Sequence, residues 1–193
     1  MTIGCIHGRF QPFHNGHFEY LKAAYERSER LIVGITQYDQ AVYDQGSPAH
    51  RLNVADNPFT YWDRAEFIRA AINYEGIPEA RITIVPFPIH APDTIKNFVD
   101  PESVMFTTIY EKWNIEKIRR LRAQGFPVRV LWRRNYKQYE GKEVRLAMRE
   151  DLELFQTLVP QGVYDKLRDL GRLTANRLIP DRRQIDDLGQ RIR

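Results

Sequence analysis

The sequence contains a single cysteine and no long apolar run. Cys5 alone cannot form a disulfide within the chain, which excludes a disulfide-stabilised secreted scaffold. The chain also lacks the run of about 18 apolar residues that a membrane helix needs, so no membrane partner is expected. Met1 leads directly into the apolar residues 3–6, without the basic segment and long apolar stretch of a secretory leader. Together these absences predict a cytoplasmic protein.

Several familiar catalytic patterns are absent as well. The chain has no GxxxxGK[ST] stretch, which disfavours the P-loop class of nucleotide-binding proteins. It has no recognisable Ser-His-Asp or Cys-His arrangement of the kind that supports nucleophilic catalysis. Internal repeats and low-complexity runs are also missing. Any chemistry is therefore expected to rest on positioning and electrostatics.

The composition is that of one folded domain. At 193 residues, with 42% hydrophobic and 12% aromatic residues, the chain can bury most of the surface that its unfolded form would expose. We expect one domain over residues 1–171. Residues 172–193 form a charged tail or an extra helix, which could provide an oligomer contact, and a homo-oligomer is predicted.

The charge balance is compatible with an anionic ligand. The net charge is +4 and the isoelectric point is near 9.2, although a mixed-charge surface accounts for most of this excess. The arginines of residues 114–124 and of the tail are compatible with RNA binding. Because the chain has no aromatic-interleaved RNP motif, a solvated surface explains them better, and no nucleic-acid partner is predicted.

Five apolar runs alternate with helical patterns. Strands are expected near residues 3–6, 31–36, 82–87, 104–108 and 128–132. Helices are expected near residues 19–30, 62–74 and 114–124, and in two further segments within 152–171. This order with short links predicts right-handed parallel crossovers. The expected fold is α/β: a Rossmann-like, doubly wound, parallel five-stranded sheet with C-terminal helices.

The stretch GRFQPFHNGH at residues 8–17 connects the first strand to the first helix. In open α/β sheets, ligands bind at this carboxyl end of the strands. A helix that begins near His17 directs unpaired N–H groups and a positive dipole end at any anion above it. Gly8 and Gly16 allow the backbone to approach that anion without a Cβ atom in the way. We therefore predict a phosphate-binding turn.

Two histidines and an arginine supply side-chain donors to this turn. His14 and His17 are three residues apart, so they share one face of the helix and can donate to the same phosphate oxygens. Arg9 adds a permanent charge with a forked donor geometry. A metal site and a purely structural turn are alternatives. Zinc would need further ligands, and the other histidines and Cys5 fall at no recognisable ligand spacing.

The same ten residues resemble the HxGH signature of the nucleotidylyltransferase superfamily. GRFQPFH resembles the archaeal-type nicotinamide mononucleotide adenylyltransferases in particular, and the resemblance spans about residues 1–170. It implies contacts to the triphosphate by Arg9, His14 and His17. Gly8, Phe10 and Gly16 of the same turn are predicted to bind the nucleotide with them.

A second segment matches the same family. Residues 57–60 read NPFT and open a helix, with Thr60 as the expected N-cap. In the family an arginine a few residues later helps to hold the phosphates. Arg64 occupies that place, which implies the same role for it.

A third segment, residues 139–145, matches in part. It lies where the family has a serine-glycine-threonine-x-isoleucine-arginine motif, and Gly141 and Arg145 match that motif. Glu140 and Lys142 replace the serine and the threonine, so two hydroxyl donors are missing. Lys142 can supply positive charge to the β- or γ-phosphate instead. Glu140 would repel the phosphates unless it faces away or meets a metal ion.

Acceptor recognition is expected in residues 88–98, where the resemblance places it. The family typically has an acidic residue followed by a tryptophan that packs on the nicotinamide ring, and this segment has no tryptophan. The candidate acceptor-binding residues are His90, Asp93, Lys96 and Phe98. The polar stretch 37–56 is interpreted as a long loop that either covers the site or only decorates the surface.

The resemblance implies adenylyl transfer from ATP to a small phosphorylated acceptor such as nicotinamide mononucleotide. The acceptor oxygen attacks the α-phosphorus in line and pyrophosphate leaves, with Mg²⁺ bridging the phosphates. A dianionic phosphate acceptor needs no general base. The altered segments leave open cytidylyl or adenylyl transfer to another phosphorylated or phosphonate metabolite. A nucleotide-binding regulator without turnover is a further alternative.

Overall fold

The computed structural model describes residues 2–39, 56–171, 173–174 and 177–178. Most of the loop predicted at residues 37–56 and most of the tail predicted at residues 172–193 lie outside the described residues. Within the described residues, no helix is both long enough and apolar enough to cross a bilayer.

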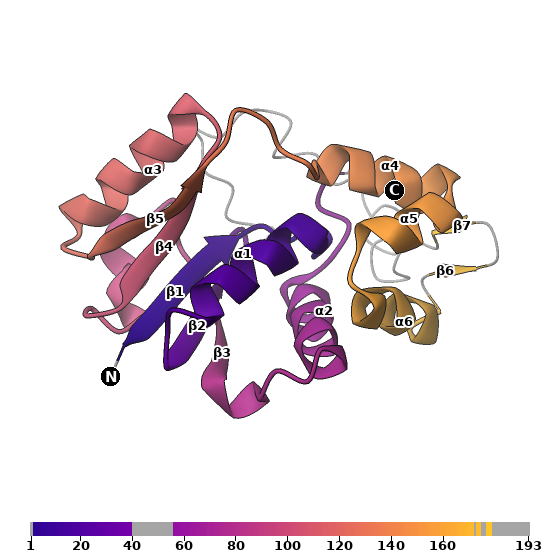
Figure 1. Cartoon of the computed structure of the whole chain (residues 1–193), viewed down its shortest axis with the longest axis horizontal. Coiled ribbons are helices and arrows are strands. Elements are labelled where there is room, and N and C mark those ends of the chain that lie inside the picture. The colour runs from indigo at the N-terminus through magenta and orange to yellow at the C-terminus, as the bar shows by residue number, and fades with distance from the viewer. Residues whose placement is uncertain (1, 40–55, 172, 175–176, 179–193) are drawn as a thin grey trace, which may run out of the picture.

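Five parallel strands form the sheet that positions the site (Figure 1). Their order in space is β3-β2-β1-β4-β5. The strands are β1 (Ile3–Gly8), β2 (Arg30–Ile35), β3 (Ile82–Pro86), β4 (Val104–Ile109) and β5 (Val128–Arg133). The chain adds strands on one side of β1 and then crosses to the other side, so the order reverses between β1 and β4. This is the predicted doubly wound Rossmann-like fold, and the prediction is confirmed.

Helices cover the sheet and extend the molecule beyond it. The α-helices are α1 (Asn15–Tyr25), α2 (Tyr61–Tyr74), α3 (Lys112–Ala123), α4 (Gly141–Glu150), α5 (Leu152–Leu158) and α6 (Gln161–Asp169). Two 3₁₀ turns, η3 (Glu79–Arg81) and η4 (Pro92–Asn97), precede β3 and β4, and β6 (Leu173–Thr174) pairs antiparallel with β7 (Arg177–Leu178). Helices α4 to α6 form a group that lies against α2 (Figure 1).

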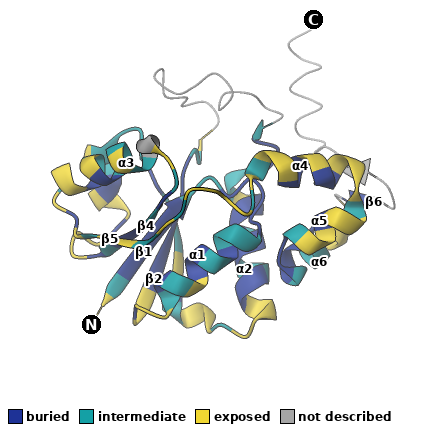
Figure 2. Cartoon of the chain, turned by 45° about the horizontal axis from the view of Figure 1, so that its top comes forward, coloured by how far each residue is buried: buried dark blue, intermediate teal, exposed yellow. Residues whose placement is uncertain are grey.

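The alternation of side chains along the strands builds two apolar cores. Ile6 and Phe106 belong to a core with α1, α2 and the C-terminal helices. Cys5 and Met105, one position earlier on the same strands, belong to a second core with η4 and α3. The central strands β1, β2 and β4 are therefore largely buried, and the helices pack their inner faces against the cores and leave their outer faces exposed (Figure 2). This two-sided burial is what a parallel sheet requires.

The two neighbours of β1 pair with it over different lengths. β1 pairs with β2 from Ile3–Arg30 to Gly8–Ile35, along its whole length. With β4, the pairing among the described residues comprises Gly4–Val104 and Cys5–Met105. In its carboxyl half, β1 therefore pairs with β2 but, among the described residues, no longer with β4. The strand order reverses at this point.

Candidate active site

The predicted phosphate-binding turn lies at the carboxyl edge of the sheet. β1 ends at Gly8, residues 9–14 form the turn, and α1 begins at Asn15. Because β1 is the strand at which the order reverses, the turn borders the crevice in which open α/β sheets bind ligands.

Buried aromatic side chains anchor the turn from below. Phe10 and Phe13 are both fully buried in the core beside α1. The Gln11 side chain ties the turn to a distant segment: its Nε2 donates to the Phe59 carbonyl at 2.8 Å, and the Phe59 N–H donates to Oε1 at 3.0 Å. Phe10, predicted beside the nucleotide, is fully buried beneath the turn, and its ring lies edge-on to that of His17 with centroids 5.0 Å apart.

His14 and His17 hold each other in a reciprocal cap at the start of α1. The His17 N–H donates to Nδ1 of His14 at 3.3 Å, and the His14 N–H donates to Nδ1 of His17 at 3.4 Å. Their rings stack with centroids 3.6 Å apart. The structure therefore brings the two predicted histidines together on one face, as their spacing indicates.

Both imidazoles are neutral near pH 7. Burial, followed by the charge of Arg145, lowers the pKa of His14 from 6.5 to about 3. Burial, the adjacent His14 and Arg9 also hold the pKa of His17 well below its usual value, against the opposing effect of a hydrogen bond with the Pro12 backbone. Since each Nδ1 accepts a hydrogen bond, the ring proton must lie on Nε2. Each histidine is thus a neutral N–H donor.

Both predicted glycines are closely packed, and Gly8 more tightly than Gly16. A Cβ atom on Gly8 would lie 2.8 Å from the ring of Phe10. A Cβ atom on Gly16 would lie 3.2 Å from the Tyr139 ring and 3.3 Å from the His14 ring. The Tyr139 ring, 6.2 Å from that of His14, closes this side of the histidine pair. Arg9 is half-buried and near enough for its charge to lower the pKa of His17.

Arg64 binds backbone carbonyls at the ends of two strands. Only 1% of its surface is exposed. Its Nη1 donates to the carbonyls of Arg9 and Thr36, both at 2.8 Å, and its Nη2 donates to that of Gln37 at 2.8 Å. Nε donates to Thr60. Arg64 therefore fastens α2 to the turns after β1 and β2, a set of partners different from the predicted phosphates.

Arg145 joins the helix α4 to the phosphate-binding turn. Its Nη1 donates to the Gln11 carbonyl at 3.0 Å, and its Nη2 pairs with Asp56 at 2.5 Å. Gly141 begins α4, and a Cβ atom there would lie 3.2 Å from Nη1 of Arg145. The guanidinium is buried, and its charge reaches His14, whose pKa it lowers.

The two substituted positions at the start of α4 are exposed. Glu140 is the N-cap residue, but its side chain makes no capping hydrogen bond. Lys142 follows in the first turn, also exposed. Both side chains are therefore available to a ligand at this edge.

The predicted acceptor residues separate into two groups. The rings of His90 and Phe98 lie 6.1 and 6.4 Å from that of Tyr38, which follows β2, and the three rings form one half-exposed aromatic cluster. Asp93 is exposed in η4. The structure does not bring Lys96 to the site: its Nζ lies 6.0 Å from the ring of Phe126, at the amino end of β5.

Sequence reasoning overlooked several residues of the site. Gln11 stands inside the motif at residues 8–17, as a polar residue between the apolar residues Phe10 and Pro12, and that contrast was a usable signal. Tyr139 directly precedes the segment at residues 140–145. Tyr38 and Asp56 carried no local signal, because only folding brings them to His90 and Arg145.

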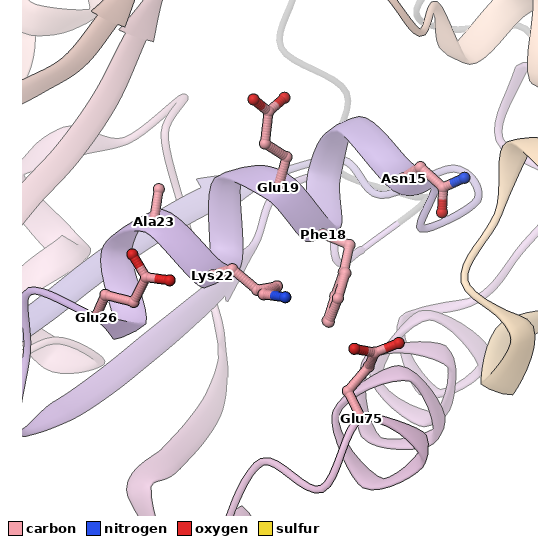
Figure 3. A pocket seen from close by; sticks show the side chains of 7 residues that line it. All are labelled: Asn15, Phe18, Glu19, Lys22, Ala23, Glu26 and Glu75. Atoms are coloured by element: carbon pink, nitrogen blue, oxygen red, sulfur yellow. The ribbon is translucent and has the colours of Figure 1, made fainter.

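Away from this edge, the described residues form a hollow but no metal centre. Among the described residues, no group of three or more histidine, cysteine, aspartate or glutamate side chains could hold a metal ion. A shallow hollow of about 540 Å³ lies along the outer face of α1 near the end of α2 (Figure 3). Its lining residues are Asn15, Phe18, Glu19, Lys22, Ala23, Glu26 and Glu75, none of which was predicted to bind a substrate.

The model of the family described as cytidylyltransferase-like matches residues 5–124, which include the turn and both histidines. The chain belongs to the cytidylyltransferase-like family. The predicted resemblance of the chain to nucleotidylyltransferases is thereby confirmed, and nucleotidyl transfer is the reaction that this membership supports.

Individual relatives within this family differ in nucleotide and acceptor. Phosphonoformate cytidylyltransferase of Streptomyces viridochromogenes is 35% identical over 169 residues, covering 87% of this chain and 91% of that protein. Nicotinamide-nucleotide adenylyltransferase of Saccharolobus solfataricus is 27% identical, covering 88% and 92%. The enzyme of the same name from Thermococcus sibiricus is 29% identical, covering 86% and 83%.

Two solved structures share the fold. The bifunctional NMN adenylyltransferase/ADP ribose pyrophosphatase of Francisella tularensis, complexed with AMP and manganese, superposes with a TM-score of 0.60 at 18% identity. Thermotoga maritima TmcAL bound with alpha-thio ATP gives 0.61 at 12% identity. They cover 90% and 89% of this chain, which spans 50% and 56% of theirs. At these identities the likeness establishes the fold alone.

Proposed function

We propose that this protein transfers a cytidylyl group from CTP to a small phosphonate acceptor such as phosphonoformate, with release of pyrophosphate. The reaction class rests on the reciprocal His14–His17 pair at the first βα corner, inside the segment matched by the family. The nucleotide and the acceptor rest on the relative at 35% identity, against 27% and 29% for the two adenylyltransferases.

The corner is suited to the phosphates of the nucleotide. The start of α1 directs its unpaired N–H groups and the positive end of its dipole to the carboxyl edge. His14 and His17 add two neutral Nε2–H donors, and Arg9 adds a fixed positive charge. Lys142, exposed in the first turn of α4, extends the positive charge toward the leaving pyrophosphate.

The reaction is a substitution at the α-phosphorus. An acceptor oxygen forms a bond to that phosphorus while the bond to the pyrophosphate oxygen breaks, and the electron pair leaves with pyrophosphate. The donors of the corner stabilise the charge that grows on the phosphate oxygens. A phosphonate that is already ionised needs no general base, which agrees with two histidines that burial keeps neutral.

Magnesium fits this site as a companion of the nucleotide rather than as a resident ion. Mg²⁺ commonly uses one or two carboxylates together with substrate phosphates. Glu140 at the start of α4 is exposed and would provide such a carboxylate, whereas Asp56 is paired with Arg145. When bound, the ion would neutralise phosphate charge.

A second candidate is adenylyl transfer from ATP to nicotinamide mononucleotide. It is favoured by the several adenylyltransferases among the relatives and by the aromatic cluster of Tyr38, His90 and Phe98, which could stack on a nicotinamide ring. It ranks second because these relatives are less similar to this chain and because residues 88–98 contain no tryptophan.

Pyrophosphate release separates these candidates. The purified protein is incubated with Mg²⁺ and each nucleoside triphosphate, paired in turn with phosphonoformate and with nicotinamide mononucleotide. Release that requires CTP and phosphonoformate is the expected result. Release only with ATP and nicotinamide mononucleotide would favour the second candidate. Tight nucleotide binding without release for any acceptor would point to a regulator and overturn the proposal.

A further inference from the structure

The Tyr20 side chain occupies the gap at which β1 and β4 stop pairing. The register Gly4–Val104 and Cys5–Met105, if continued, would let the His7 N–H donate to the Phe106 carbonyl. Instead, the buried Tyr20 hydroxyl accepts from the His7 N–H and donates to the Phe106 carbonyl at 2.5 Å. The two strands are therefore held apart at their carboxyl ends, beside the proposed site.

His7 lies on the far side of this gap from α1. Alternation along β1 places it on the same face as Cys5, the face covered by η4 and α3. Its ring stacks on that of Phe87, with centroids 4.4 Å apart and planes 6° apart. The residue is only 4% exposed, yet within the described residues neither ring nitrogen has a hydrogen-bond partner.

Thr107 occupies the position on the neighbouring strand that corresponds to His7. It follows Met105 by two positions, as His7 follows Cys5, so the same register aligns the two side chains on one face. Thr107 is fully buried, and its hydroxyl likewise has no partner among the described residues. Two buried polar side chains, neither with a partner among the described residues, thus occupy equivalent positions on one face of the sheet at the point where the strand order reverses.

Two buried polar side chains without hydrogen bonds destabilise the fold unless a ligand provides the missing hydrogen-bond partners. A buried polar group without a hydrogen bond destabilises a fold, and apolar residues of the same shape would avoid that cost. The surroundings favour an anion, because the charge of Lys117 on α3 reaches His7. Phe87, on which the His7 ring stacks, is followed closely in the chain by His90, a residue predicted to bind the acceptor.

We propose that His7 and Thr107 bind the non-reacting carboxylate of the acceptor. A neutral imidazole provides one N–H donor and a threonine provides one O–H donor, which together can satisfy the two oxygens of a carboxylate. The phosphonate of the same molecule would then face the nucleotide at the corner that begins two residues after His7. This inference rests on the proposed function and specifies its acceptor as a compact molecule with two anionic groups.

Two nearly isosteric variants test the pair. Thr107→Val removes the hydroxyl, and His7→Phe removes both nitrogens while keeping a ring that stacks on Phe87. Each should raise the KM for phosphonoformate about tenfold or more, as expected for a lost hydrogen bond to a charged group, and leave the KM for CTP unchanged. Their melting temperatures should stay the same or rise, because an unsatisfied buried polar group is removed.

Ser103 provides a matched control. Its hydroxyl is also fully buried without a partner among the described residues, but it lies at the amino end of β4. Ser103→Ala should therefore leave the KM for phosphonoformate unchanged. Methylphosphonate, which lacks the carboxylate, provides the second control, because the KM for it should not respond to either site variant.

The outcomes separate this inference from the proposed function. If the wild-type protein releases pyrophosphate and Thr107→Val and His7→Phe leave the KM for phosphonoformate unaltered, the inference fails alone. A fall in melting temperature without a change in that KM would assign the pair a purely structural role and also overturn it. If no acceptor supports turnover, the proposed function fails, and calorimetric binding of phosphonoformate to the wild type and variants still decides the inference.

Discussion

At the scale of single residues, the environment of the histidines matters more than their presence. The motif predicts two imidazoles at a phosphate site, but only their burial shows that they are neutral donors. Their mutual cap also restricts both rings to one orientation. Pre-organised donors of this kind stabilise charge that develops in a transition state without reorganising at the moment of reaction.

Replacing His17 with alanine should lower turnover by about 10²-fold or more, the scale of one lost transition-state donor. Steady-state kinetics with CTP and phosphonoformate measure the effect, and the KM for CTP should change less than kcat. Lys22→Ala, on the same helix but in the hollow of Figure 3, serves as the control and should keep full activity. Near-normal turnover of His17→Ala would contradict the proposed role of His17 as a transition-state donor.

His14 should make stability depend on pH. Its pKa is about 3 in the folded protein and 6.5 when exposed, so the unfolded state binds the extra proton between these values. The contribution of His14 is complete above pH 6.5 and is lost as the pH falls toward 3. Between about pH 7 and 5.5, denaturant titrations should show about 1 kcal/mol less loss of unfolding free energy for His14→Gln than for the wild type. Equal losses would contradict a neutral, buried His14.

At the scale of secondary-structure elements, helix side chains hydrogen-bond to the strand ends in places where the backbone pairing of the sheet has stopped. Arg64 brings α2 to the turns after β1 and β2, and Tyr20 of α1 bridges β1 and β4. Both residues act on the carboxyl edge of the sheet, where the ladder no longer holds the strands. The site is therefore shaped by a few long polar side chains that reach from helices to strand ends.

Arg64→Lys should destabilise the protein by about 3 kcal/mol, because an ammonium group cannot reach the carbonyls of Arg9, Thr36 and Gln37 together. Denaturant unfolding measures this loss. The KM for the nucleotide should rise as well, since the backbone of Arg9 loses its anchor. Arg69→Lys, on the exposed side of α2, should cost less than about 1 kcal/mol. Equal losses of unfolding free energy for the two substitutions would show that the hydrogen bonds of Arg64 to the three carbonyls are unimportant.

Tyr20→Phe should destabilise the protein by about 1–3 kcal/mol, since it leaves the His7 N–H and the Phe106 carbonyl buried without their bridge. Thermal and denaturant unfolding report the loss. Tyr25→Phe on the same helix is the matched control: its hydroxyl accepts from Arg81 in a half-buried position, and its removal should cost less. A Tyr20→Phe protein as stable as the control would refute the bridging role.

At the scale of the whole molecule, the C-terminal helices complete the site. Arg145 reaches from α4 to the Gln11 carbonyl and to Asp56, which links the group α4 to α6 with the turn after β1. The same helix presents Glu140 and Lys142 at the edge. Helix α4 and the turn after β1, which are far apart in the sequence, thus meet at the predicted phosphate-binding site.

Arg145→Met should lower both stability and turnover, because it leaves Asp56 without its buried partner. We expect a loss of about 3 kcal/mol in unfolding free energy and a fall in turnover of about 10²-fold. Combining it with Asp56→Asn tests the pair. If the double variant recovers stability but not turnover, Arg145 acts on the reaction as well as on the fold, whereas independent, additive losses would contradict the pairing.

The sequence alone was sufficient for the architecture and the reaction class. Periodic apolar runs predict the five strands, and the local pattern of residues 8–17 predicts the turn and the His14–His17 pair, because both depend on neighbours in the chain. The partners of Arg64 and Arg145, the departure of Lys96 from the site, and the His7–Thr107 pair were decided by the tertiary structure. Each depends on contacts between segments far apart in the sequence, and on burial, which determines whether a polar group binds a carbonyl, a neighbour or a ligand.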